Sequence, residues 1–177
     1  MADSLLIEHV PSSALTPAVA AAVRDLCDAA YGEATDSLFA ALGPGDHLLA
    51  LVGGELVSHL MWVTRWLEPR GLRRLRTAYV EMVATAPEAQ GRGYATALLE
   101  RFPPLVASYE LAALAPATEN LYARLGWCFW RGPLSTRREG RLEATPEERV
   151  MILPLPRTPL LDLDAPLSVE WRPGEVW

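Results

Sequence analysis

An apolar strand, a turn with two glycines and an amphipathic helix follow one another between residues 76 and 102. Residues 76–86 are apolar and β-rich and stop at Pro87, which is typical of a strand covered on both faces. The helix expected from Arg92 has an apolar stripe made of Tyr94, Leu98, Leu99 and Phe102. Pro103 and Pro104 must end or kink this helix, because proline has no backbone N–H to donate. We expect this segment to form the centre of an α/β fold.

The rest of the chain predicts strands and helices that would complete one domain. Strands are expected at residues 5–10, 48–52, 55–65, 109–114, 127–130 and 150–155. Helices are expected at residues 17–31, 36–41 and 117–125. After Pro156 the sequence has three more prolines and no periodicity, which indicates a proline-stiffened arm. We therefore expect a single domain over residues 1–177, with residues 156–177 as its C-terminal arm.

The composition argues against several classes of partner and site. The net charge of −6 disfavours nucleic acid, because binding there depends on neutralising phosphates. The two cysteines and the single histidines His9, His47 and His59 lack metal-ligand or disulfide spacing, so we expect no metal site and no catalytic histidine. No apolar run approaches the roughly 20 residues of a membrane span, and the N-terminal residues do not resemble a secretory leader. We therefore expect a cytoplasmic protein that contacts no membrane.

The turn at residues 90–93 has the chemistry to hold a phosphate. Gly91 and Gly93 directly precede a helix and leave backbone N–H groups uncovered at the positive end of its dipole, where a phosphate or diphosphate binds. Arg92 adds a fork of donors. A plain strand-to-helix turn is the alternative for such a pair of glycines.

The segment Q-G-R-G-Y-A at residues 90–95 resembles the acyl-CoA signature of the GNAT N-acetyltransferase superfamily, and V-A-T-A-P and N-L-Y-A-R-L-G-W are similar to that superfamily too. The resemblance implies the GNAT fold, a mixed and mostly antiparallel sheet of about seven strands flanked by helices, and acetyl-CoA as acetyl donor. Homodimers are common in this superfamily, so we expect one here. The residues that would bind CoA are Met82, Val83, Ala84, Thr85, Gln90, Gly91, Arg92, Gly93, Tyr94, Ala95 and Thr96.

Segments in the last hundred residues resemble the aminoglycoside 2'-N-acetyltransferases, above all S-V-E-W-R-P-G-E-V-W at the end. The resemblance implies resistance to a cationic antibiotic and an arm that folds back to the acceptor pocket. That pocket would be lined by Glu33, Glu148, Glu175 and the terminal carboxylate of Trp177. Family members have aspartate where this chain has these glutamates, and glycine in place of Met82. Both kasugamycin and the deoxystreptamine drugs therefore stay open as acceptors.

Glu81 and Tyr122 are the candidates for proton transfer. Carboxylates that attract an ammonium group also raise the pKa of the amine that must attack the thioester, so a base is needed. Glu81 lies where family members place a base-like glutamate, and its alternative role is a salt bridge to Arg73, Arg74 or Arg76. Tyr122 matches the tyrosine that the superfamily uses as general acid for the CoA thiolate, and its alternative role is core packing.

Two other functions are consistent with these residues. A GNAT enzyme for another amine, such as a polyamine or a peptide N-terminus, would use the same CoA turn with a different acceptor wall. A non-catalytic acyl-CoA-binding module would bind CoA without acetylating an amine, and Glu81 and Tyr122 argue against it.

Overall fold

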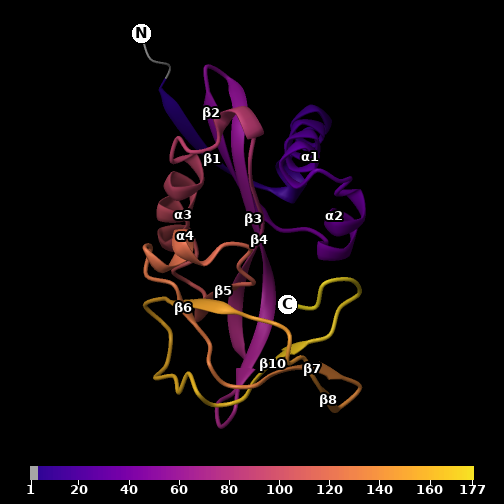
Figure 1. Cartoon of the computed structure of the whole chain (residues 1–177), viewed down its shortest axis with the longest axis vertical. Coiled ribbons are helices and arrows are strands. Elements are labelled where there is room, and N and C mark those ends of the chain that lie inside the picture. The colour runs from indigo at the N-terminus through magenta and orange to yellow at the C-terminus, as the bar shows by residue number, and fades with distance from the viewer. Residues whose placement is uncertain (1–3) are drawn as a thin grey trace. The chain divides into compact units, whose positions relative to one another are not determined.

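Two long strands, β3 (Glu55–Pro69) and β4 (Leu75–Thr85), organise residues 4–177, which are the residues described by the computed structural model (Figure 1). The described chain divides into two units. The first comprises the residues up to Val63 together with Val80–Phe102, and the second comprises Thr64–Tyr79 with Pro103–Trp177. Each unit therefore contains part of β3 and part of β4. The single-domain organisation stays a prediction.

The first unit contains a three-stranded antiparallel segment between helices. β1 (Leu5–Pro11) pairs with β2 (Asp46–Val52), and β2 pairs with the first part of β3. Gly53 and Gly54, with φ of 60° and 86°, form the two-residue turn between β2 and β3, which were expected as strands at residues 48–52 and 55–65. Figure 1 shows α1 (Pro17–Tyr31) and α2 (Asp36–Leu42) on one side of these strands and α3 (Tyr94–Leu105) on the other.

Side chains that alternate along β3 contact helices on opposite faces. The ring of His59 lies 3.7 Å from Cys27 Sγ of α1, whereas Trp62 packs edge-on against Phe102 of α3 with ring centroids 5.3 Å apart. Of the predicted stripe on α3, Leu98, Leu99 and Phe102 are buried and Tyr94 is partly exposed. The prolines expected to end the helix lie in its last turn, and α3 ends at Leu105.

The second unit contains most of a mixed sheet. In the described chain, β5 (Leu111–Leu114), β6 (Cys128–Phe129), β7 (Leu134–Arg138), β8 (Arg141–Ala144), β9 (Met151–Pro154) and β10 (Leu167–Glu170) join β3 and β4 in the order β6-β9-β5-β4-β3-β10-β7-β8. The pairs β4–β5 and β7–β10 are parallel, whereas β3–β10, β5–β9, β6–β9 and β7–β8 are antiparallel. The predicted α/β class with a mixed sheet flanked by helices is confirmed.

Three local predictions were wrong. The helix expected at residues 117–125 is the short α4 (Glu119–Ala123), because the Tyr122 carbonyl closes the turn by accepting from the N–H of Leu125 and of Trp127. The hairpin of β7 and β8 was not predicted, because its strands are polar and give no apolar alternation. The C-terminal arm was expected to lack regular structure, but it contains the strand β10. Within residues 4–177 no helix has the length and apolar character needed to cross a membrane.

Candidate functional site

The turn that precedes α3 has an exposed backbone in a phosphate-binding geometry. Gly91 and Gly93 have φ of 74° and 84°, and a Cβ added to either would meet no atom within 4 Å. Glycine is therefore required by the left-handed backbone and not by crowding. The Gly93 carbonyl accepts the first helical hydrogen bond from Ala97, at 3.0 Å, so the first N–H groups of α3 have no intrahelical acceptor. These residues fit a diphosphate at a helix N-terminus.

The strand that leads into this turn is held by side chains along its carbonyl groups. Four successive carbonyls, of residues 82–85, each accept a hydrogen bond from a side chain. The donors to Met82, Val83, Ala84 and Thr85 are, in this order, His59 Nδ1 at 2.9 Å, Tyr31 Oη at 3.1 Å, Ser58 Oγ at 2.9 Å and Gln90 Nε2 at 3.2 Å. The predicted CoA-binding strand and turn are thus fixed by α1, β3 and by each other.

Met82 interrupts the regular strand. Its φ of 53° lies in the left-handed region, which is costly for a residue with a Cβ, by about 1 kcal/mol or more. Such a conformation persists only where the surroundings hold it, and it is common at functional sites. The partly exposed Glu81 and Val83 flank this buried residue. Because glycine adopts this conformation freely, the glycine expected here in relatives suits the same backbone.

Glu81, the candidate base, is partly exposed in the first unit. The three arginines that offered it a purely structural role all contact other groups. Their partners are Glu110 for Arg73, Glu68 for Arg74 at 2.9 Å, and the ring of Tyr109 for Arg76, at 3.9 Å from the ring centroid. The role of Glu81 as base stays a prediction.

Tyr122, the candidate acid, lies on α4 in the second unit and is 6% exposed. Its ring packs edge-on against Trp127, with centroids 6.1 Å apart, so the packing role expected as an alternative is present. Burial raises the pKa of Tyr122 to about 12. The hydroxyl therefore stays protonated at neutral pH, as a donor must.

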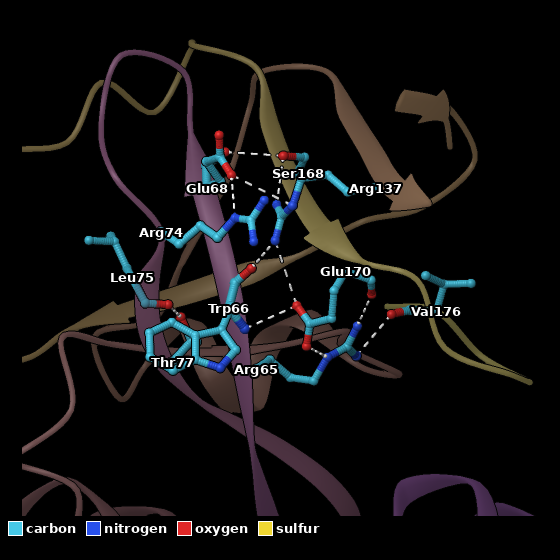
Figure 2. A network of polar contacts seen from close by, with 10 residues as sticks. All are labelled: Arg65, Trp66, Glu68, Arg74, Leu75, Thr77, Arg137, Ser168, Glu170 and Val176. Atoms are coloured by element: carbon cyan, nitrogen blue, oxygen red, sulfur yellow. Dashed lines mark hydrogen bonds and ion pairs between the residues drawn. The ribbon is translucent and has the colours of Figure 1, made fainter. Parts of the chain in front are cut away.

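The C-terminal segment is clamped by Arg65, which is only 3% exposed (Figure 2). Arg65 Nε donates to Glu170 Oε1 at 2.7 Å, Nη2 to the Glu170 carbonyl at 2.6 Å and Nη1 to the Val176 carbonyl at 3.0 Å. The second carboxylate oxygen of Glu170 accepts from the N–H of Trp66 at 3.0 Å. A buried guanidinium thus fixes both ends of residues 170–176.

Trp177 is 2% exposed, and its indole N–H donates to Thr145 Oγ1 at 2.8 Å. The Thr145 carbonyl also accepts a hydrogen bond from the N–H of Glu148 at 3.2 Å. Thr145 therefore contacts both Trp177 and the backbone of Glu148, two of the residues predicted to line the acceptor pocket. Trp171 is 38% exposed, and Arg138 Cζ lies 4.2 Å from the centroid of its ring. The buried anchors are Trp177 and Arg65.

The predicted acceptor residues fall into two groups. Glu148, Glu175 and Trp177 belong to the second unit, where the first two are exposed and the Glu175 carbonyl accepts from Arg172 Nε at 2.6 Å. Glu33 is exposed in the first unit, directly after Gly32, which ends α1 with φ of 74°. Thr145 links the backbone of Glu148 to the indole of Trp177, and Glu175 lies in the same tail two residues before Trp177.

Sequence reasoning missed Arg65 and the buried histidines. Arg65 stands in the otherwise apolar run Leu60–Leu67, and a charge in such a run must find a partner when it is buried. That signal was available. His47 and His59 gave none, because their contacts depend on strand pairing and not on sequence spacing.

Comparison with known proteins agrees with the resemblance seen in the sequence. Residues 14–129 match the family model described as an acetyltransferase (GNAT) domain. The aminoglycoside 2'-N-acetyltransferase of Mycolicibacterium fortuitum is 32% identical over 161 residues, and the alignment covers 87% of this chain and 82% of that protein.

Solved structures show the same fold. The GNAT family N-acetyltransferase YhbS from Escherichia coli, solved in complex with CoA, gives a TM-score of 0.65 at 16% identity, over 96% of this chain and 91% of that one. Eis1 from Mycobacterium abscessus gives 0.62 at 24% identity over 75% of this chain. The match covers 33% of Eis1, so this chain spans about a third of that protein.

Proposed function

Because the chain belongs to the GNAT acetyltransferase family and is an acetyl-CoA-dependent N-acetyltransferase, we propose that it transfers the acetyl group to an aminoglycoside, at the 2' amine. The observation that carries the acceptor class is the fixed tail, which holds exposed acids beside a buried Trp177 in a chain 32% identical to an aminoglycoside 2'-N-acetyltransferase. Kasugamycin and the deoxystreptamine drugs are both acceptors to be tested. Resistance to the acetylated drug would follow.

The donor site is proposed at β4 and the turn after it. The N–H groups at the start of α3, together with Arg92, hold the diphosphate of CoA. The backbone of residues 82–85 lies along the pantetheine arm. Gln90 supports this arrangement, because its side chain ties the turn to the Thr85 carbonyl at 3.2 Å.

The acceptor site is proposed to use carboxylates. A carboxylate about 4 Å from an ammonium group gains roughly 4 kcal/mol at an effective dielectric near 20, before desolvation is subtracted. Glu33, Glu148 and Glu175 supply this attraction, and Trp177 supplies an apolar wall. In this proposal, residues 156–177 form part of the acceptor site, and the whole chain is a single catalytic domain.

The chemistry is direct attack of the amine nitrogen on the thioester carbonyl, after which the C–S bond breaks. Glu81 takes the proton that the ammonium group loses, directly or through water. Tyr122 donates to the leaving sulfur. A phenol with a pKa of about 12 gives up its proton to a thiolate of pKa about 8.5 only at a cost, so a hydrogen bond to the developing charge is the main contribution expected of Tyr122.

A panel assay of thiol release from acetyl-CoA tests this proposal. Kasugamycin, gentamicin and tobramycin are compared with spermidine and with a peptide bearing a free N-terminus. Turnover with at least one aminoglycoside, in preference to the other amines, is expected. Turnover with the polyamine or peptide alone overturns the acceptor class, and tight CoA binding without any turnover supports the non-catalytic alternative. A homodimer and a cytoplasmic location stay predictions, and light scattering tests the first.

A further inference from the structure

Three side chains that the proposed reaction does not use form a continuous hydrogen-bonded row inside the first unit. Ser12 Oγ lies 2.9 Å from His47 Nε2, His47 Nδ1 lies 2.9 Å from His59 Nε2, and His59 Nδ1 lies 2.9 Å from the Met82 carbonyl. His47 is 3% exposed and His59 is fully buried. We call Ser12, His47 and His59 the histidine row.

The chemistry of the last acceptor sets the direction of every bond in the row. A carbonyl only accepts, so His59 Nδ1 carries a proton, and in a neutral ring His59 Nε2 then accepts from His47 Nδ1–H. His47 Nε2 then accepts from the Ser12 hydroxyl, whose oxygen accepts the N–H of Gly45 at 2.9 Å. Burial keeps both rings neutral at neutral pH, so each has one defined tautomer. Burial lowers the pKa of both histidines, that of His59 to about 3, which agrees with neutral rings.

The row ends on the one residue of β4 whose backbone is strained. Met82 has φ of 53° and lies between Glu81 and Val83, and its carbonyl belongs to the peptide group that joins it to Val83. The other partner near His59 Nδ1 is Cys27 Sγ at 3.7 Å, which is a weaker contact than the 2.9 Å bond to the carbonyl. The carbonyl is thus held by a donor that is itself fixed by two further residues.

We propose that His59, oriented by His47 and Ser12, is a positioning residue that fixes the Met82 peptide and thereby presents Val83 to acetyl-CoA and Glu81 to the acceptor amine. The proposal rests on the proposed donor site at β4. His59 touches no substrate in this scheme. Its effect passes through the backbone, so loss of the donor weakens acetyl-CoA binding and slows turnover together.

Two variants of the same residue separate this role from simple core packing. The amide nitrogen of asparagine occupies the place of His59 Nδ1, whereas the amide oxygen of glutamine reaches the place of Nε2 and accepts from His47 Nδ1–H. His59→Asn therefore keeps the donor to the Met82 carbonyl and loses the contact with His47. His59→Gln keeps the contact with His47 and loses the donor. Val23→Ala, in the buried core of α1, is the control for a general loss of stability.

The measurements are the dissociation constant for acetyl-CoA, the kinetic constants, and hydrogen exchange of the peptide that covers residues 81–85. We expect His59→Gln to weaken acetyl-CoA binding by about tenfold, to lower kcat and to speed exchange in this peptide. His59→Asn should stay within about threefold of the wild type in all three. Val23→Ala should lower Tm and leave the acetyl-CoA dissociation constant unchanged.

Equal behaviour of His59→Gln and His59→Asn overturns the positioning role, whether both match the wild type or both lose activity in proportion to their Tm. The proposed function fails separately. If wild-type protein does not bind acetyl-CoA, the donor site at β4 is wrong, and the exchange of residues 81–85 in the two variants still decides whether His59 holds this backbone.

Discussion

Tyr122, the proposed general acid, illustrates how burial limits proton donation by a tyrosine. Its hydroxyl stays protonated because its pKa is raised to about 12, and the same shift makes it a weak acid toward a thiolate. Packing against Trp127 fixes the ring, so a hydrogen bond to a developing charge needs no reorganisation.

We therefore expect Tyr122→Phe to lower kcat by about 10²-fold, at the lower end of the range for general acid–base help. The acetyl-CoA dissociation constant should stay nearly the same, because the change removes one oxygen and leaves the ring. Steady-state kinetics with isothermal titration of acetyl-CoA measures both. An unchanged kcat would remove Tyr122 from the mechanism.

His59 predicts a loss of stability in acid. Its pKa is lowered from 6.5 to about 3 by burial first and by His47 second, so the unfolded chain binds its proton more readily than the folded one. The stabilisation is complete above about pH 6.5 and falls as the pH drops toward 3, by at most about 1.4 kcal/mol per pH unit. His47, whose pKa is also lowered, acts in the same direction despite the nearby Asp46.

Urea unfolding at pH 7.5 and 4.5 measures this effect, with His59→Asn as the comparison. The lowered pKa of Glu110, about 2, destabilises both proteins in acid and cancels in the difference. The wild type should lose more free energy of unfolding than the variant. The same loss in both would show that His59 does not titrate with folding.

At the scale of elements, local sequence signals predicted where α1 begins and ends. The β7–β8 hairpin and β10 could not be predicted in this way, because they depend on tertiary contacts. α1 runs over the predicted residues because Thr16 caps it at 3.3 Å, Pro17 begins it and Gly32 ends it. The polar hairpin turn at Glu139 and Gly140, with φ of 51° and 77°, gave no apolar pattern to read.

The candidate site also has a part that local sequence predicts and a part that depends on tertiary contacts. The turn at residues 90–93 was recognisable because glycine before a helix has a local meaning. The histidine row was not, since it joins Ser12 to His47, which is 35 positions further along the chain. β10 was missed because its four residues are stabilised by β3 on one side and β7 on the other, which no local pattern records.

Because Arg65 holds the C-terminal segment, we expect its substitution to cause a large loss of stability. Arg65→Met removes a buried guanidinium and leaves its acceptors, the carboxylate and carbonyl of Glu170 and the carbonyl of Val176, without this donor, which should cost about 2–3 kcal/mol of stability. Arg131→Met breaks an exposed pair with Asp164 and should cost less than about 1 kcal/mol.

Denaturant unfolding compares the two variants, and acceptor KM reports on the tail. We expect Arg65→Met to raise the KM for the aminoglycoside more than that for acetyl-CoA. Equal losses of stability in the two variants would contradict the clamp.

At the scale of the whole molecule, the net charge of −6 suits a polycationic acceptor. Glu33, Glu148 and Glu175 are exposed, and the attraction proposed for them would be screened by salt, because the Debye length is about 8 Å at 0.15 M ionic strength. Raising the ionic strength should increase the aminoglycoside KM severalfold and leave kcat nearly unchanged. A KM that does not respond to salt would contradict acceptor binding by charge.

The central claim is that this GNAT enzyme acetylates the 2' amine of an aminoglycoside. Mass spectrometry of kasugamycin, gentamicin and tobramycin after incubation with the enzyme and acetyl-CoA tests it most directly, with fragmentation to locate the added group. We predict a gain of one acetyl group on the 2' nitrogen of at least one drug. No mass gain on any of the three, with acetylation of a polyamine or peptide under the same conditions, would contradict the claim.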